Sequence, residues 1–192
     1  MPGSPTAQVS DTQRPPKARA MPGWGVAACL LAGLGEMLLL TALSTEYWML
    51  SRGPQHTGHS GLWQVCVTGM QETCDTPTDV TGTVQATRIC LVLAAVLGVL
   101  CTVLAVAAVT SCPCRDSGVG PGATIVSFAA GVLGLAAMVV FTAGVWDSTA
   151  SSQVQRSFGW SFSLGWAGPP ALLLAGVCSL LLHLRRGPYS HI

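Results

Sequence analysis

The sequence predicts an all-α membrane protein with four transmembrane helices and with short strands in one large loop outside the membrane. Half of the residues are hydrophobic and only 9% are charged, whereas a soluble domain has about 25% charged residues. Eight acidic and nine basic side chains are too few to cover a soluble fold of 192 residues. The mean hydropathy of +0.54 agrees with this class. The net charge of +1 gives no indication of a nucleic-acid partner.

Four apolar runs have the length of a transmembrane helix, which is about 20 residues. We expect these spans at residues 24–44, 88–110, 121–145 and 161–184. On one side of the membrane they leave a large outer loop, residues 46–87, and a short outer loop, residues 146–160. Residues 1–20 are rich in Pro, Ser, Thr and Gln and lack apolar periodicity, so we expect a disordered cytosolic tail. Residues 187–192 form a second short tail.

Glu36 is the one charged residue of the first span. A carboxylate in the middle of a membrane costs roughly 2.5 to 3.5 kcal/mol on insertion scales. We interpret Glu36 as protonated or hydrogen-bonded and facing the other helices, because buried polar groups normally find partners. A contact with an ion or with a partner protein is the alternative.

Small residues recur at every fourth position in the other three spans. The rows are Ala94, Gly98 and Thr102; Ala123, Ser127 and Gly131; and Ala171, Ala175 and Ser179. Such rows let helix backbones pack closely in lipid, where the hydrophobic effect does not drive association. They predict homo-oligomers or contacts with other membrane proteins.

Basic residues predict the orientation, because cytosolic loops carry an excess of Lys and Arg. With four spans, both termini and the loop between the second and third spans share one side of the membrane. The residues on that side are Arg14, Lys17, Arg19, Arg115, Arg185 and Arg186, against Arg52, Arg88 and Arg156 on the other. Both termini are therefore expected in the cytosol. The expected location is the plasma membrane.

The large loop has the features of a small strand-rich unit. Leu62, Gln64 and the stretch Val65–Val67 alternate in the manner of short strands, and nearby Gly and Pro residues suit turns. Cys66 and Cys74 are the only cysteine pair in the outer, oxidising loop, so they are expected to form a disulfide. Closing so short a loop contributes roughly 2.5 kcal/mol in the chain-entropy model.

The remaining cysteines fall into two groups. Cys29, Cys90, Cys101 and Cys178 lie in the spans, where we interpret them as small apolar filling residues. Cys112 and Cys114 lie at a cytosolic helix end, which is a common context for S-palmitoylation. Two free thiols are an equally good interpretation of that pair.

The loop carries a motif that resembles the claudin superfamily, which includes the claudins, peripheral myelin protein, the epithelial membrane proteins and the lens-fibre intrinsic membrane protein. The motif follows the first span and consists of Trp48, Gly61, Leu62, Trp63, Cys66 and Cys74. Val84–Arg88 is similar to the start of the second span in that family, so Arg88 corresponds to the family arginine. The resemblance covers about residues 22–186, and we expect a claudin-like four-span domain over residues 21–186.

Three further stretches look like one branch of this superfamily, the one that holds the natural killer cell granule protein, claudin domain-containing protein two and the lens-fibre protein. They are residues 42–48, 59–63 and 158–166. The chain also departs from other members. It contains no asparagine, so it cannot carry the N-glycan of the epithelial membrane proteins, and it ends in Ser190-His191-Ile192 where many claudins end in Tyr-Val.

The resemblance implies a left-handed four-helix bundle with a small extracellular antiparallel β-sheet made from both outer loops. The Cys66–Cys74 disulfide would pin this sheet, and the family tryptophans and Arg88 would anchor it to the bundle. On this view the motif residues stabilise the loop. Partner contacts would then come from the parts between them, such as residues 52–57 and 67–73.

Other chemistry finds little support in the sequence. His56 and His59 lack a third metal ligand nearby, so no metal site is expected. Phosphate-binding and catalytic motifs are missing from the sequence, so we expect neither a cofactor nor enzyme activity. Ser190–Ile192 places a hydroxyl two residues before an apolar terminal residue, a weak pattern for binding to a PDZ domain.

Three functions remain open, the first following the resemblance to claudins and the second, in vesicles or granules, the resemblance to the branch named above. The first is a non-enzymatic tetraspan protein that organises cell–cell contact or membrane structure through its outer loops. The second is an accessory or trafficking subunit of another membrane protein in vesicles or granules. The third is a paracellular ion pore, which would prefer cations because Glu46, Glu72, Asp75 and Asp79 outnumber Arg52 and Arg88 in the large loop.

Overall fold

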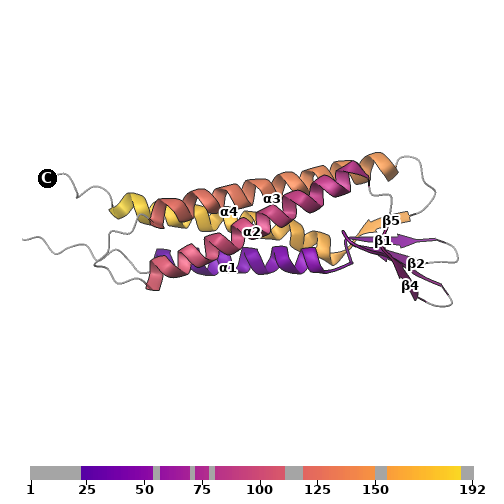
Figure 1. Cartoon of the computed structure of the whole chain (residues 1–192), viewed down its shortest axis with the longest axis horizontal. Coiled ribbons are helices and arrows are strands. Elements are labelled where there is room, and N and C mark those ends of the chain that lie inside the picture. The colour runs from indigo at the N-terminus through magenta and orange to yellow at the C-terminus, as the bar shows by residue number, and fades with distance from the viewer. Residues whose placement is uncertain are drawn as a thin grey trace, which may run out of the picture.

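The protein consists of four long helices that lie side by side, with a small sheet at one end (Figure 1). The computed structural model describes residues 23–53, 57–69, 72–77, 81–110, 119–149 and 155–186. The helices are α1 (Gly23–Ser44), α2 (Gly82–Thr110), α3 (Val119–Thr149) and α4 (Trp160–Arg186). Each contains a segment that is long and apolar enough to cross a membrane. The prediction of four transmembrane helices is therefore confirmed.

The helices alternate in direction, so the start of α1 and the end of α4 lie at the end of the bundle away from the sheet (Figure 1). Helix α2 begins at Gly82, ahead of the start expected for the second span at residue 88. The backbone N–H of Gln85 already donates to the carbonyl of Thr81 at 3.1 Å, which is the first hydrogen bond of a helix. The first turns of α2 therefore lie at the end of the bundle that carries the sheet (Figure 1).

The sheet has five short strands, and all neighbouring strands are antiparallel, as predicted. The strands are β1 (Met49–Arg52), β2 (Thr57–Ser60), β3 (Val65–Thr68), β4 (Glu72–Asp75) and β5 (Gln155–Phe158), in the spatial order β4-β3-β2-β1-β5. Four strands come from the large loop and β5 from the short loop. Leu62 and Gln64 lie outside the strands, in the connection between β2 and β3, where Gly61 N–H donates to the Gln64 carbonyl at 2.9 Å.

The small residues of the helices face the inside of the bundle. Ala94, Ser127 and Ala175 are at most 1% exposed, and the Ser127 hydroxyl donates to the Leu172 carbonyl at 2.5 Å, which joins α3 to α4. The rows that predicted contacts between molecules thus pack the four helices of one molecule together. They give no support for a lateral interface between copies.

Helices α1 and α4 approach each other closely at Gly35. A Cβ atom placed there would lie 3.0 Å from the Gly168 carbonyl oxygen and 3.1 Å from the Leu172 backbone nitrogen. Because both obstacles are backbone atoms, they cannot move aside without separating the helices. Gly33, two residues earlier on the same helix, has no atom within 4 Å of the corresponding position.

We therefore predict that Gly35→Ala destabilises the bundle by about 1–3 kcal/mol, because overpacking shifts the backbones apart. Gly33→Ala is the matched control and should be neutral or slightly stabilising, since Ala favours a helix more than Gly does. Thermal unfolding of both variants in the same detergent measures the difference. Equal stabilities of the two variants would contradict the close α1–α4 contact.

Candidate functional site: the sheet and its contact with the helices

Trp48 lies where the sheet meets the helices, and it is fully buried. Its indole N–H donates to the Ala42 carbonyl at 2.7 Å, near the end of α1. The ring makes edge contacts with Phe141 of α3, at a centroid distance of 5.0 Å, and with Phe162 of α4, at 6.2 Å. The backbone of Trp48 also bonds to Ser60 before the turn and to Gly159 after β5. One residue therefore joins three helices and both outer loops.

Arg88 of α2 makes a second contact between the helices and the sheet. Its Nε atom donates to the Leu62 carbonyl at 2.6 Å, and its guanidinium lies 5.1 Å from the centre of the Trp63 ring. The Trp63 indole N–H in turn donates to the Leu43 carbonyl at 2.9 Å. Leu62 itself is 1% exposed. The turn between β2 and β3 is thereby fixed to the ends of α1 and α2.

Gly61 allows that turn to lie directly on the chain that leaves α1. A Cβ atom at this position would lie 2.6 Å from the Cα of Glu46 and 3.1 Å from the Thr45 carbonyl oxygen. Any side chain would push the turn away from α1 and with it Leu62 and Trp63. The first residue of the Gly-Leu-Trp motif is therefore glycine for a steric reason.

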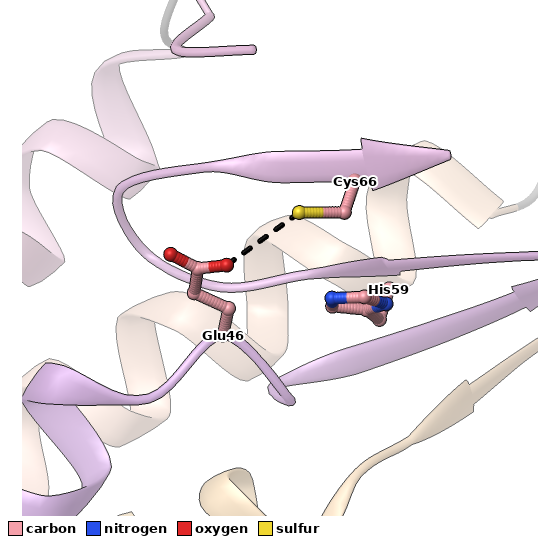
Figure 2. A group of neighbouring side chains, drawn as sticks. All are labelled: Glu46, His59 and Cys66. Carbon is pink, nitrogen blue, oxygen red and sulfur yellow. Dashed lines mark hydrogen bonds between the residues drawn. The ribbon is translucent and has the colours of Figure 1, made fainter. Parts of the chain in front are cut away.

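Cys66 and Cys74 form a disulfide, as predicted. They are direct partners across β3 and β4. Cys66 is buried, and a carboxylate oxygen of Glu46 contacts its sulfur at 3.5 Å. Figure 2 shows Glu46 and Cys66 pointing toward each other, with the His59 ring beside them. Because the disulfide sulfur carries no proton, this contact is not a donated hydrogen bond.

His59 of β2 is held in a defined orientation next to this disulfide. Its ring stacks on Tyr47 at a centroid distance of 4.5 Å, and its Nε2 atom lies 3.9 Å from a carboxylate oxygen of Glu72 on β4. Tyr47 also stacks on Trp160 at the start of α4. Three strands and the chain before β1 therefore contribute to one group of side chains.

The register gives the sheet two chemically different faces, because side chains alternate along a strand. His59, Cys66 and Cys74 are cross-strand neighbours and share one face, which we call the disulfide face. Val65 and Val67 point to the other face, together with their partners Asp75 and Thr73 on β4. We call these four residues the valine face, and all four are exposed.

Comparison with known proteins agrees with this architecture. The profile of the PMP-22/EMP/MP20/Claudin family matches residues 24–179. The chain belongs to this family. It is similar to Protein NKG7 of Mus musculus, with 37% identity over 81% of this chain and 90% of the relative. Claudin domain-containing protein 2 of Mus musculus is 32% identical over 79% and 82% of the two chains. Lens fiber membrane intrinsic protein of Homo sapiens is 26% identical over 79% and 88%.

The family membership confirms the resemblance found in the sequence, including its branch. Some predicted sites lie outside the described residues, so they stay predictions. These are the tail at residues 1–20, His56, the possible palmitoylation sites Cys112 and Cys114, and the possible PDZ-binding end Ser190–Ile192. The expected cytosolic position of Cys112 and Cys114 also stays a prediction.

The sequence analysis did not find the group formed by Glu46, His59, Glu72 and the disulfide. These residues are separated along the chain and no local spacing joins them. The signal lies in the strand register, which places His59 opposite Cys66 and Cys66 opposite Cys74. Pairing of β5 with β1 was likewise not visible from the residues of the short loop alone.

Glu36 of this family member lies inside the helix bundle, 5% exposed. Its carboxylate lies against Gly98 of α2, where a Cβ atom would collide with it. The side chain therefore faces the other helices, as interpreted from the sequence. Within the described part of the chain, neither carboxylate oxygen has a hydrogen-bond partner, so the hydrogen-bonded alternative is not found there.

We predict that Arg88→Lys lowers the free energy of unfolding by about 1.5–3 kcal/mol, because a hydrogen bond from a charged group to the Leu62 carbonyl is lost. The planar contact with Trp63 is lost as well. Arg52→Lys makes the same substitution at an exposed position of β1 and should change stability by less than about 0.5 kcal/mol. Thermal unfolding, with the near-UV circular dichroism of the tryptophans as the signal, checks both values.

A second prediction concerns Glu36. Glu36→Met should stabilise the protein by about 1–3 kcal/mol, since it removes a buried polar group without a hydrogen-bond partner. Glu36→Gln keeps buried polar atoms and should gain less. Unfolding in mild detergent measures the three proteins side by side. A loss of stability in the Met variant would instead show that the Glu36 carboxyl group makes a stabilising contact.

Proposed function

We propose that this protein is a non-enzymatic tetraspan protein that organises cell–cell contact or membrane structure through its sheet. In this proposal the sheet lies outside the cell and both termini lie in the cytosol, in accord with the distribution of basic residues. The plasma membrane is the proposed location. Lipid contacts the outward sides of the helices, which carry many exposed apolar side chains such as Leu30, Val96, Ile125 and Val132.

The observation that carries the proposal is the exposed valine face on a firmly held sheet. Val65 is 40% exposed and Val67 44%, although the sheet itself is fixed to the helices through Trp48 and Arg88. Apolar side chains that stay exposed on a rigid, projecting surface favour binding to another protein. Part of this surface coincides with residues 67–73, where the sequence analysis placed partner contacts.

The acidic residues give less support to a cation-selective pore than their number suggested. Glu46 is half-buried against the disulfide, and Glu72 lies beside His59. Asp79 lies outside the described residues. In the described part of the large loop, Asp75 has neither kind of contact and is exposed on the valine face. A pore lined by this loop is therefore the weakest of the three proposals.

An accessory or trafficking role in vesicles or granules is the second candidate. It is supported by the likeness to Protein NKG7 together with the branch that the sequence resembles. The small-residue rows do not add to it, because they are buried within the bundle. Its partner would have to bind the lipid-facing sides of the helices or the sheet. A PDZ domain at Ser190–Ile192 is a further proposed partner.

The test of the proposed function is localisation in mixed cultures of expressing and non-expressing cells. We predict enrichment at borders between two expressing cells, and loss of this enrichment in the double variant Val65→Lys/Val67→Lys. Two charges on the valine face should prevent an apolar contact without disturbing the buried anchor. Thr76→Lys/Ser157→Lys, which places the same charges on exposed positions outside residues 52–57 and 67–73, is the matched control.

The outcomes separate the candidate functions. A vesicular pattern that ignores the neighbouring cell would overturn the contact function and favour the accessory role. Equal behaviour of the two double variants would show that the valine face is not the contact surface. Deletion of residues 146–160 is a poorer experiment, because it removes β5 and with it one edge of the sheet.

A further inference from the structure

The disulfide face holds a set of side chains with the chemistry of a zinc site. Zinc prefers cysteine thiolates and imidazole, with carboxylate oxygens as additional ligands, in a tetrahedron. His59 of β2, Cys66 of β3, and Cys74 and Glu72 of β4 share this face. As long as Cys66 and Cys74 are joined by the disulfide, neither sulfur is a thiolate. The oxidised sheet therefore lacks two of the four ligands.

We infer that, once the disulfide is reduced, this face binds one zinc ion through His59, Cys66, Cys74 and Glu72. The chemical step is balanced. A thiol or phosphine reductant supplies two electrons and is itself oxidised, and two protons convert the disulfide into two thiols. Zinc then displaces the two thiol protons as it binds the sulfurs. The site is thus available only in the reduced protein.

The distances between most of the candidate ligand atoms are close to those of a tetrahedral site, and His59 has to move closer to Cys74 when zinc binds. Zinc bonds of about 2.0 Å to nitrogen or oxygen and 2.3 Å to sulfur separate neighbouring ligand atoms by about 3.3 to 3.8 Å. His59 Nε2 and Glu72 Oε1 are 3.9 Å apart. The ligand atoms of Cys66, Cys74 and Glu72 lie within 4.8 Å of one another. Reduction frees the two sulfurs to separate to the required distance.

Glu72 is the better fourth ligand than Glu46. Glu72 lies close to both sulfurs and to His59, whereas Glu46 shares its group only with His59 and Cys66. Glu46 approaches Cys66 from the chain before β1 (Figure 2). Glu46 would therefore lie beside the zinc-bound Cys66 sulfur without binding the metal itself. The stack of His59 on Tyr47 holds the imidazole ring in a fixed orientation. This favours metal binding, because the side chain loses less conformational entropy when it binds.

The strand arrangement explains why this site escapes a search of the sequence. His59 and Cys66 are separated by a turn, and Cys74 follows on a third strand. Only the register of β2, β3 and β4 brings them to one face. The site is independent of the valine face on the opposite side of the sheet, so failure of the proposed contact function leaves this inference untouched.

The experiment uses the full chain in detergent, in a Cys112→Ser/Cys114→Ser background that removes the other candidate thiol pair. Protein reduced with a phosphine is incubated with zinc sulfate, desalted and analysed for zinc by mass spectrometry. We expect about one zinc ion per reduced chain and none per oxidised chain. Cobalt(II) in place of zinc should give the absorption bands of a tetrahedral thiolate site. No excess of zinc in the reduced protein would overturn the inference.

Variants test the assigned ligands. His59→Ala and Glu72→Gln keep the disulfide pair and should each weaken zinc binding by more than about tenfold, whereas Thr68→Ala on the same face should not. Cys66→Ser/Cys74→Ser reports any zinc held by the cysteines of the helices. Zinc should also slow reoxidation by oxidised glutathione, measured by thiol labelling. Unchanged reoxidation, or full binding in His59→Ala, would show that the proposed site does not form.

Discussion

The burial of Trp48 is the contact on which the arrangement of sheet and helices depends. The sheet is too small to have a hydrophobic core of its own, since its strands have four residues each. It therefore takes its stability from the helix ends, through an indole ring inserted between α1, α3 and α4. Removing a buried aromatic side chain of this kind costs about 3–5 kcal/mol. Such a loss would loosen the sheet, which Arg88 and Trp63 would still hold at the turn between β2 and β3.

The other motif residues act around this contact. Gly61 lets the turn lie on the chain leaving α1, Arg88 binds the carbonyl of Leu62, and the disulfide joins the neighbouring strands β3 and β4. These residues fix the position of the sheet on the helices. Val65 and Val67 lie outside the motif and are exposed, and they belong to the surface that we propose for partners. Because the residues that anchor the sheet differ from those on its exposed face, a shared fold can present different surfaces in different members of a family.

Much of this architecture was predictable from the sequence, and the exceptions have physical causes. Apolar runs of membrane-spanning length identify helices because lipid requires every backbone group to be satisfied within the segment. The disulfide between Cys66 and Cys74 was predicted only because both cysteines lie in the outer, oxidising loop. The small-residue rows, in contrast, were correctly expected to support close packing, but periodicity does not reveal whether a helix face meets its own bundle or another molecule. Ala94 and Ser127 show that here it meets its own bundle. The group around His59 arises from strand register, which local spacing does not encode.

The pairing of β5 with β1 has a consequence for biosynthesis. Synthesis proceeds from the N-terminus, so the large loop is made long before β5 and α4 exist. Until the fourth span is inserted, Trp48 lacks Phe162 as a neighbour and β1 lacks one strand partner. The first loop is therefore incomplete until then, with an unpaired edge at β1 and an indole ring that lacks its contact with α4. Chaperones that recognise exposed apolar surface would find their target here, and release from them would report that the last helix has entered the membrane.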